Sequence, residues 1–179
     1  MLLRRYLLIV PFLLGSFGLK KKDAGFIDWQ ADRKLEWIDF EGNPEKGSDR
    51  AALSSVQINI NFSLKNDQPE WHITCRFNKK KSWGKTKTDY ILSHEQAHFD
   101  ITEIFARKLH QRMLAYQLNK RNFQQDLQEI YQKTMKEENE MQRAYDQETE
   151  HSIIREKQAD WLEKIKKLLA DSENFTNYR

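Results

Sequence analysis

Cysteine, proline and glycine are all scarce in this sequence. Its 179 residues include one cysteine, three prolines and six glycines. A single cysteine excludes a framework of internal disulfides, so packing, with or without a metal ion, must stabilise the fold. So little glycine and proline excludes collagen-like and linker-like chains. An aromatic content of 12%, with five tryptophans, argues against a disordered chain, because such chains are poor in large apolar side chains.

The sequence also lacks a strong excess of charge of one sign. Thirty Lys and Arg residues face 27 Asp and Glu residues, and the formal net charge is +3. This balance gives no electrostatic basis for binding nucleic acid, so we expect no nucleic-acid partner. The length fits one domain that is large enough to bury a hydrophobic core.

The first 18 residues differ in character from the rest of the chain. Two arginines precede the apolar run 6–14, and Ser16 and Gly18 supply small residues at the −3 and −1 positions of a cleavage site after Gly18. This pattern predicts a signal peptide at residues 1–18 and a mature domain at residues 19–179. The alternative is an uncleaved membrane anchor, but a helix of roughly 14 apolar residues spans only about 21 Å of a roughly 30 Å hydrocarbon core.

A signal peptide of this kind predicts an exported protein, either periplasmic or secreted. No stable membrane insertion is expected once the peptide has been cleaved. Because Arg4 and Arg5 leave with the peptide, the mature domain is closer still to neutral.

Alternating apolar and polar residues predict strands in the first half of the mature domain. The alternation runs along residues 56–64 and again along 71–77, with a polar turn at 65–69 between them. It predicts an antiparallel hairpin with one buried face, on which Cys75 is expected to be an unreactive buried thiol. Residues 26–42 predict two short strands or one bent strand.

From Thr88 onward the hydrophobic period becomes that of helices. It predicts three helices, at about residues 90–116, 122–150 and 153–170. We interpret the Gln-, Glu- and Lys-rich stretch 124–143 as the solvated face of the second helix. Strands followed by helices define the α+β class, with a small antiparallel sheet followed by a helical region.

The first predicted helix contains an H-E-x-x-H motif, His94-Glu95-Gln96-Ala97-His98. Residues four apart lie 40° apart around a helix axis, so both imidazoles can reach one metal ion, and neutral imidazole suits Zn²⁺. Glu95 lies beside that position, where it can act as the catalytic base for an activated water. Random placement would produce this motif in about one such chain in a hundred.

A catalytic zinc site requires a third protein ligand and an open position for water. Asp100 and Glu103 point to the opposite side of the helix, and His110 lies about 18 Å along its axis. The third ligand must therefore come from another element. Spacing alone leaves three alternatives, which are His151, a glutamate within residues 137–150 such as Glu148, and His72 on a strand.

Further motifs extend the pattern beyond the histidine pair. The sequence Tyr-Asp-x-x-Thr-x-His occupies residues 145–151 and is followed by Gln158 and Trp161, while residues 35–42 contain a W-x-D-F-x-G start. Together these motifs resemble domain-of-unknown-function family 922, over roughly residues 26–169. The resemblance implies a secreted, zinc-dependent bacterial protease with a zincin-like H-E-x-x-H active-site helix.

Carried over by position, the resemblance makes His94 and His98 zinc ligands and Glu95 the catalytic base. It also makes His151 the third zinc ligand. Ser152 stands where the family's cluster usually ends in glycine.

Two residues of the second motif have no single role at this stage. Tyr145 could donate a hydrogen bond to an oxyanion or could pack as a core aromatic. Asp146 could orient a metal-bound histidine or could be a solvated or capping residue.

The sequence thus predicts an exported zinc metallopeptidase whose partner is a peptide or protein substrate. One alternative is a catalytically silent, zinc-stabilised domain that binds a partner at the cell envelope. Another is a helical interaction protein that docks through residues 120–170 and carries an accidental H-E-x-x-H sequence.

Overall fold

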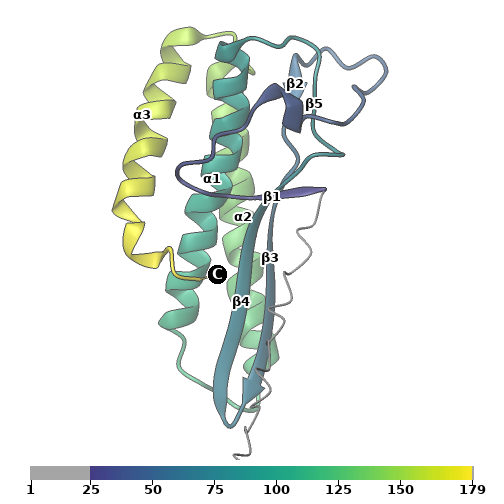
Figure 1. The fold of residues 1–179 in the computed structure, drawn as a ribbon. Coiled ribbons are helices and arrows are strands. Elements are labelled where there is room, and N and C mark those ends of the chain that lie inside the picture. The colour runs from purple at the N-terminus through teal and green to yellow at the C-terminus, as the bar shows by residue number, and fades with distance from the viewer. Residues whose placement is uncertain (1–24, 179) are drawn as a thin grey trace, which may run out of the picture.

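The computed structural model describes residues 25–178, in which strands are followed by helices (Figure 1). The predicted α+β class is confirmed. The predicted signal peptide, residues 1–18, and the first residues of the predicted mature domain lie outside the described residues. The elements are β1 (Phe26–Asp28), η1 (Trp37–Asp39), β2 (Ala52–Leu53), β3 (Val56–Lys65), β4 (Gln68–Asn78), β5 (Trp83–Gly84), α1 (Asp89–Leu114), α2 (Phe123–Thr149), α3 (Arg155–Asp171) and η2 (Glu173–Phe175).

Strands β3 and β4 form the predicted hairpin. Their antiparallel register runs from Val56 opposite Phe77 to Lys65 opposite Gln68. Only two residues therefore make the turn, and both have positive φ angles, which asparagine and aspartate tolerate better than other non-glycine residues. Strand β1 pairs with the other edge of β4, and β2 pairs separately with β5. Cys75 is buried on β4, as predicted.

Residues 26–42 form one strand, β1, followed by the 3-10 turn η1, and not a second strand. Asp39 accounts for the difference. Its carboxylate accepts two hydrogen bonds of 2.7 Å from the Arg33 guanidinium and one of 2.8 Å from the backbone N–H of Glu36. These bonds close a turn that periodicity alone does not reveal.

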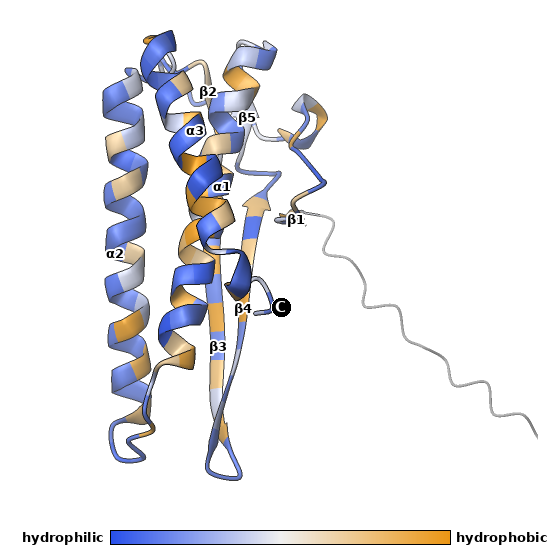
Figure 2. Cartoon of the chain, turned by 90° about the vertical axis from the view of Figure 1, so that its left-hand side faces the viewer, coloured by the Kyte–Doolittle hydropathy of each residue, from blue (hydrophilic) through white to orange (hydrophobic). Residues whose placement is uncertain are grey.

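Helix α1 is the central element of the fold. It begins after Thr88, whose hydroxyl accepts a hydrogen bond from the backbone N–H of Ile91 at 3.2 Å. The helix contacts β3 and β4 on one side and α2 and α3 on the other. Its apolar residues are therefore buried around most of its circumference, and Figure 2 shows the hydrophobic residues concentrated along it.

Helix α3 fixes the upper end of α1 and α2. Gln158 donates hydrogen bonds to the Tyr90 carbonyl and the Ser93 hydroxyl, at 3.2 and 3.0 Å. Trp161 donates to Glu148 at 2.9 Å and packs against Tyr145. None of the helices within residues 25–178 has the length and apolar character needed to cross a bilayer.

Candidate metal centre

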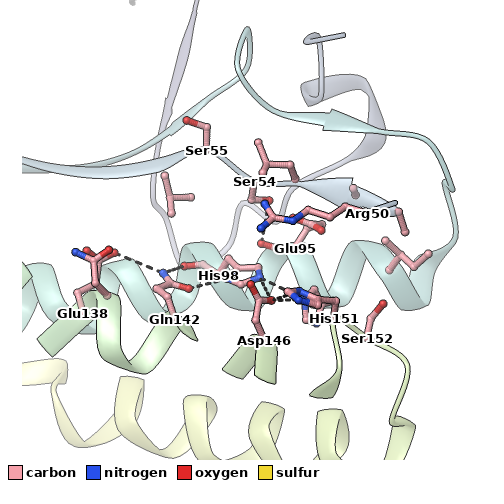
Figure 3. Close-up of a pocket in the computed structure, with 17 residues that line it drawn as sticks. Arg50, Ser54, Ser55, Glu95, His98, Glu138, Gln142, Asp146, His151 and Ser152 are labelled. Atoms are coloured by element: carbon pink, nitrogen blue, oxygen red, sulfur yellow. Dashed lines mark hydrogen bonds and ion pairs between the residues drawn. The ribbon is translucent and has the colours of Figure 1, made fainter. Parts of the chain in front are cut away.

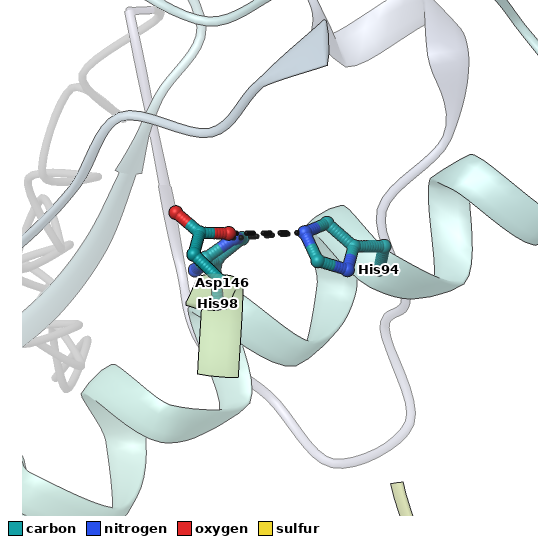
Figure 4. A group of neighbouring side chains, drawn as sticks. All are labelled: His94, His98 and Asp146. Carbon is teal, nitrogen blue, oxygen red and sulfur yellow. Dashed lines mark hydrogen bonds and ion pairs between the residues drawn. The ribbon is translucent and has the colours of Figure 1, made fainter. Parts of the chain in front are cut away.

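His94 and His98 point from α1 toward the same atom on α2. Their Nε2 atoms lie 3.3 Å apart, and the Oδ1 atom of Asp146 lies 3.3 Å from the first and 3.1 Å from the second (Figure 4). One ligand atom from each of the three residues lies within 4.8 Å of the other two. Two imidazoles and a carboxylate arranged in this way could hold one metal ion.

Gln142 sets the orientation and the tautomer of His98. The Gln142 amide nitrogen donates to the His98 carbonyl oxygen at 2.9 Å, so the amide oxygen is the atom that faces the ring. That oxygen lies 2.6 Å from Nδ1 and can only accept a hydrogen bond, so Nδ1 carries a hydrogen. In the neutral ring the lone pair is then on Nε2, which is the nitrogen that faces His94 and Asp146.

Tyr145 contacts His94 through both its ring and its hydroxyl. The two rings stack with their centroids 4.5 Å apart, and the tyrosine hydroxyl donates to the His94 carbonyl at 3.5 Å. The side chain of Tyr145 is fully buried, and burial raises the pKa of its hydroxyl. Of the two roles open for Tyr145, the geometry supports the packing role, because its hydroxyl faces the backbone of α1.

A turn after α2 brings His151 back to the same carboxylate. Glu150, His151 and Ser152 all have positive φ angles, so the chain makes an abrupt left-handed turn. Buried Thr149 stabilises the turn, because its hydroxyl accepts a hydrogen bond from the Ser152 N–H at 3.5 Å and its carbonyl accepts one from the Ile154 N–H at 2.9 Å. His151 is mostly exposed, with Nδ1 3.3 Å from Asp146 Oδ1, and it lies outside the group of three.

Replacing Ser152 by glycine should make the protein more stable. Its φ of 77° costs a residue with a Cβ atom about 1–2 kcal/mol, which exceeds the roughly 0.5–1 kcal/mol of extra chain entropy that glycine loses on folding. We expect Ser152→Gly to raise the free energy of unfolding by about 0.5–1 kcal/mol and Ser152→Val to lower it by more than about 1 kcal/mol. Urea denaturation of both variants checks this, and a fall for Ser152→Gly would contradict it.

The cluster opens into a cleft of about 410 Å³ between α1, α2 and residues 50–56 (Figure 3). Glu95, His98, Asp146 and His151 all line it. Glu95 is 4% exposed, and its Oε2 atom has no hydrogen-bond partner among the described residues. Ser54 ties the wall of the cleft to α1 by donating to the Glu95 carbonyl at 3.2 Å.

Burial and neighbouring charges shift the pKa values of His98 and Asp146 in opposite directions. Burial favours the neutral form of His98, but the Asp146 hydrogen bond and the charge of Glu95 outweigh it, so the pKa of His98 is raised. Burial would likewise raise the pKa of Asp146, but the hydrogen bonds from His94 and His98 and the charge on His98 lower it below its ordinary value. Without a metal ion, His98 and Asp146 therefore form an ion pair at pH values below the raised pKa of His98.

Glu148 and His72, two other ligand candidates from the sequence, do not belong to the cluster of three. The Glu148 carboxylate accepts the Trp161 N–H, and His72 is exposed on β4 opposite Asn61. Further down α1, the His110 ring donates through Nδ1 to the Phe175 carbonyl at 3.1 Å.

Two residues of the cleft escaped the sequence reasoning, which assigned Gln142 to a solvated face and did not single out Arg50. Glu138 belongs to the range 137–150 that offered a third ligand, and it lines the cleft without being one of the three clustered residues. Glu138 is 9% exposed and accepts a hydrogen bond of 3.0 Å from Thr102. Burial raises the pKa of Glu138. The four-residue spacing of Glu138, Gln142 and Asp146 was the signal available, because it places all three on one face of α2.

The fold and the site together define an α+β protein with a candidate His–His–Asp metal centre between two antiparallel helices. The family described as "Bacterial protein of unknown function (DUF922)" matches residues 14–152. The chain belongs to this family, which confirms the resemblance seen in the sequence. No curated protein and no solved structure matches this chain.

Proposed function

We propose that this protein is a zinc-dependent peptidase in which His94, His98 and Asp146 hold the metal and Glu95 acts as general base. The observation that carries the proposal is the spacing of 3.1–3.3 Å among the three ligand atoms, beside Glu95 on the same cleft. Atoms bound to one tetrahedral Zn²⁺ at about 2.0 Å lie about 3.3 Å apart, so the set fits this ion. Two histidines and one carboxylate also form a known type of catalytic zinc site.

The residues of the cleft support the following roles in the proposed reaction. A Zn²⁺ ion held by these residues would supply Lewis acidity, which would polarise a peptide carbonyl and make a water molecule more acidic. Glu95 accepts the proton of that water, because its buried Oε2 atom has no competing hydrogen bond among residues 25–178. Gln142 and Tyr145 keep the two imidazoles in position.

We assign the third ligand position to Asp146. Its Oδ1 atom is near both Nε2 atoms, whereas His151 contacts Asp146 itself, with Nδ1 3.3 Å from Oδ1. His151 then orients the carboxylate by donating to it from the mouth of the cleft. The role of His151 as a zinc ligand stays a prediction. The zinc affinities of Asp146→Ala and His151→Ala distinguish the two assignments.

The proposed substrate is an extended peptide. Strand β2 lines the cleft together with Glu95, and β5 is its one neighbouring strand in the part of the chain that the structure describes. A peptide can therefore pair with the open edge of β2 through backbone hydrogen bonds, which tolerate varied sequences.

Zinc affinity should depend on pH, because Zn²⁺ competes with the proton of the His98–Asp146 ion pair. The raised pKa of His98 predicts release of about one proton on zinc binding below that pKa, so the Kd should tighten about tenfold per pH unit as the pH rises toward that pKa and less steeply above it. Titrations with a competing chelator at pH 6, 7 and 8 check this. An affinity independent of pH would contradict it.

The metal-free protein should show the opposite trend. A raised histidine pKa gives stability that is fully present below about pH 6.5 and is lost as the pH rises through the folded-state pKa. The lowered pKa of Asp146 gives stability that is lost only as the pH falls below about 4. Urea denaturation of chelator-treated protein should therefore show falling stability from pH 6 to pH 8.

The test of the proposed function combines metal analysis with a cleavage assay. Purified protein should bind one equivalent of zinc and cleave casein, and a chelator should stop the cleavage until zinc is restored. One equivalent of zinc with no cleavage of casein or of a peptide library would favour the silent binding domain. Absence of zinc binding would contradict both metal-dependent functions and favour a helical interaction protein.

Export is the second part of the proposal. It rests on the basic and apolar residues 1–18, which precede the part of the chain that the structure describes. N-terminal sequencing of the protein recovered from a periplasmic or medium fraction should begin at Leu19, whereas a start at Met1 in a membrane fraction would indicate an uncleaved anchor.

A further inference from the structure

Arg50 lies above Glu95 beside the candidate metal centre, and its guanidinium has no partner among residues 25–178 (Figure 3). It is exposed in the loop that precedes β2, and its side chain reaches across the mouth of the cleft above Glu95 (Figure 3). Among the described residues that line the cleft, Arg50 is the one lysine or arginine. Its guanidinium is therefore the permanently charged cationic group that a bound substrate would meet in the cleft.

The guanidinium of Arg50 is available to a ligand. It has no hydrogen bond and no ion pair with any residue from 25 to 178. By contrast, the side chains of Arg33 and Arg112 are each held by a carboxylate, at 2.7 and 2.8 Å. Although Arg50 and Glu95 face the same space, they are not an ion pair, so the base keeps its free carboxylate and the guanidinium keeps its donors.

Two of the three acidic residues that line the cleft are already engaged by other side chains, and the third is the buried base Glu95. Asp146 contacts three histidines, and Glu138 is buried against Thr102. A zinc ion with one aspartate ligand carries a net positive charge, so it would add to the positive potential near Arg50. The mouth of the cleft is therefore suited to an anionic group, and a planar guanidinium binds a carboxylate through two parallel hydrogen bonds.

We propose that Arg50 binds a carboxylate of the substrate close to the cleaved peptide bond, either an acidic side chain or the C-terminal carboxylate. The inference rests on the proposed peptidase function and adds the substrate class. Arg50 is thereby the residue that sets specificity, while Glu95 and the metal ligands carry out the reaction.

Cleavage of matched peptides tests the proposal. One pair differs by Glu or Gln beside the cleaved bond, and a second pair differs by a free or amidated C-terminus. In one of the two pairs, the charged member carries the carboxylate that Arg50 binds. We expect wild type to cleave this member with a kcat/KM about tenfold higher than that of its uncharged counterpart, because charge-assisted hydrogen bonds are worth at least that much. Arg50→Ala should abolish the preference and Arg50→Glu should reverse it, whereas Arg121→Ala, which removes an exposed arginine outside the cleft, should leave it unchanged.

A binding assay separates this proposal from the peptidase proposal. Hydroxamates anchor on zinc, so monohydroxamates of diacids can be compared with hydroxamates of monoacids of equal chain length. At one chain length the carboxylate should tighten the Kd about tenfold in wild type and not in Arg50→Ala. Equal affinities at every length, or an Arg50→Ala variant that cleaves all peptides more slowly with unchanged preference, would overturn the role of Arg50 while the peptidase function stands. Failure of zinc and of every hydroxamate to bind would overturn both.

Discussion

Replacing Glu95 by glutamine should lower kcat/KM for casein about 10²- to 10⁴-fold and leave one equivalent of zinc bound. A general base contributes rate enhancement of this size, and glutamine keeps the shape of the side chain but accepts no proton from water. Glu95 faces the cleft without being one of the three ligand residues, so its loss should affect the reaction and not the metal. Steady-state cleavage rates and metal analysis of the same preparation measure the two effects.

Glu148→Gln is the matched control. Glu148 is exposed on α2, and a glutamine there can still accept the Trp161 N–H. Zinc content and kcat/KM should both remain at the wild-type level. Glu95→Gln should also not lower the free energy of unfolding, because it removes a buried carboxylate whose Oε2 atom has no hydrogen bond among the described residues. Equal activities of Glu95→Gln and wild type would rule out Glu95 as the base.

Asp146→Ala should weaken zinc binding more than about a hundredfold, whereas His151→Ala should weaken it about tenfold. The first change removes a ligand, and the second removes a group that orients one; losses of orienting groups cost about 10- to 100-fold in metal affinity. The reason for the difference is that Asp146 Oδ1 lies 3.3 Å or less from both Nε2 atoms of the H-E-x-x-H pair. Competition titrations with a chromophoric chelator measure both dissociation constants at one pH.

Gln147→Ala supplies the control, since Gln147 is exposed on α2 next to Asp146. Its zinc affinity should equal that of wild type. The reverse ranking, with the larger loss in His151→Ala, would assign the third ligand to His151 and leave Asp146 as its orienting partner. Similar small losses in both variants would contradict a site built from either residue.

The sequence predicted the elements of the fold closely. The helices observed at Asp89–Leu114 and Phe123–Thr149 begin and end within two residues of their predicted bounds, and the β3–β4 hairpin has the predicted buried face. These features follow from local periodicity, which depends on residues near in sequence. The relation of His94 to His98 was predictable for the same reason, because both lie on one helix.

The contacts between α1 and α2 could not be predicted from hydrophobic periodicity. Spacing shows that Gln142 and Asp146 share one face of a helix, but it does not show which element that face meets. The polar composition of residues 124–143 therefore suggested solvent, whereas Gln142 in fact binds His98. Arg50 was not singled out because its place above Glu95 depends on how the loop before β2 crosses the helix.

The row of polar side chains between α1 and α2 also determines how the two helices align. Asp146, Gln142 and Glu138 face His94, His98 and Thr102 in order along antiparallel helices. A slide by one helical turn, about 5.4 Å, would set Gln142 against His94 and Glu138 against His98, and would leave Asp146 without either histidine. Apolar contacts alone tolerate such slips more readily than directional hydrogen bonds do. The same residues that form the candidate site therefore select a single register for the helix pair.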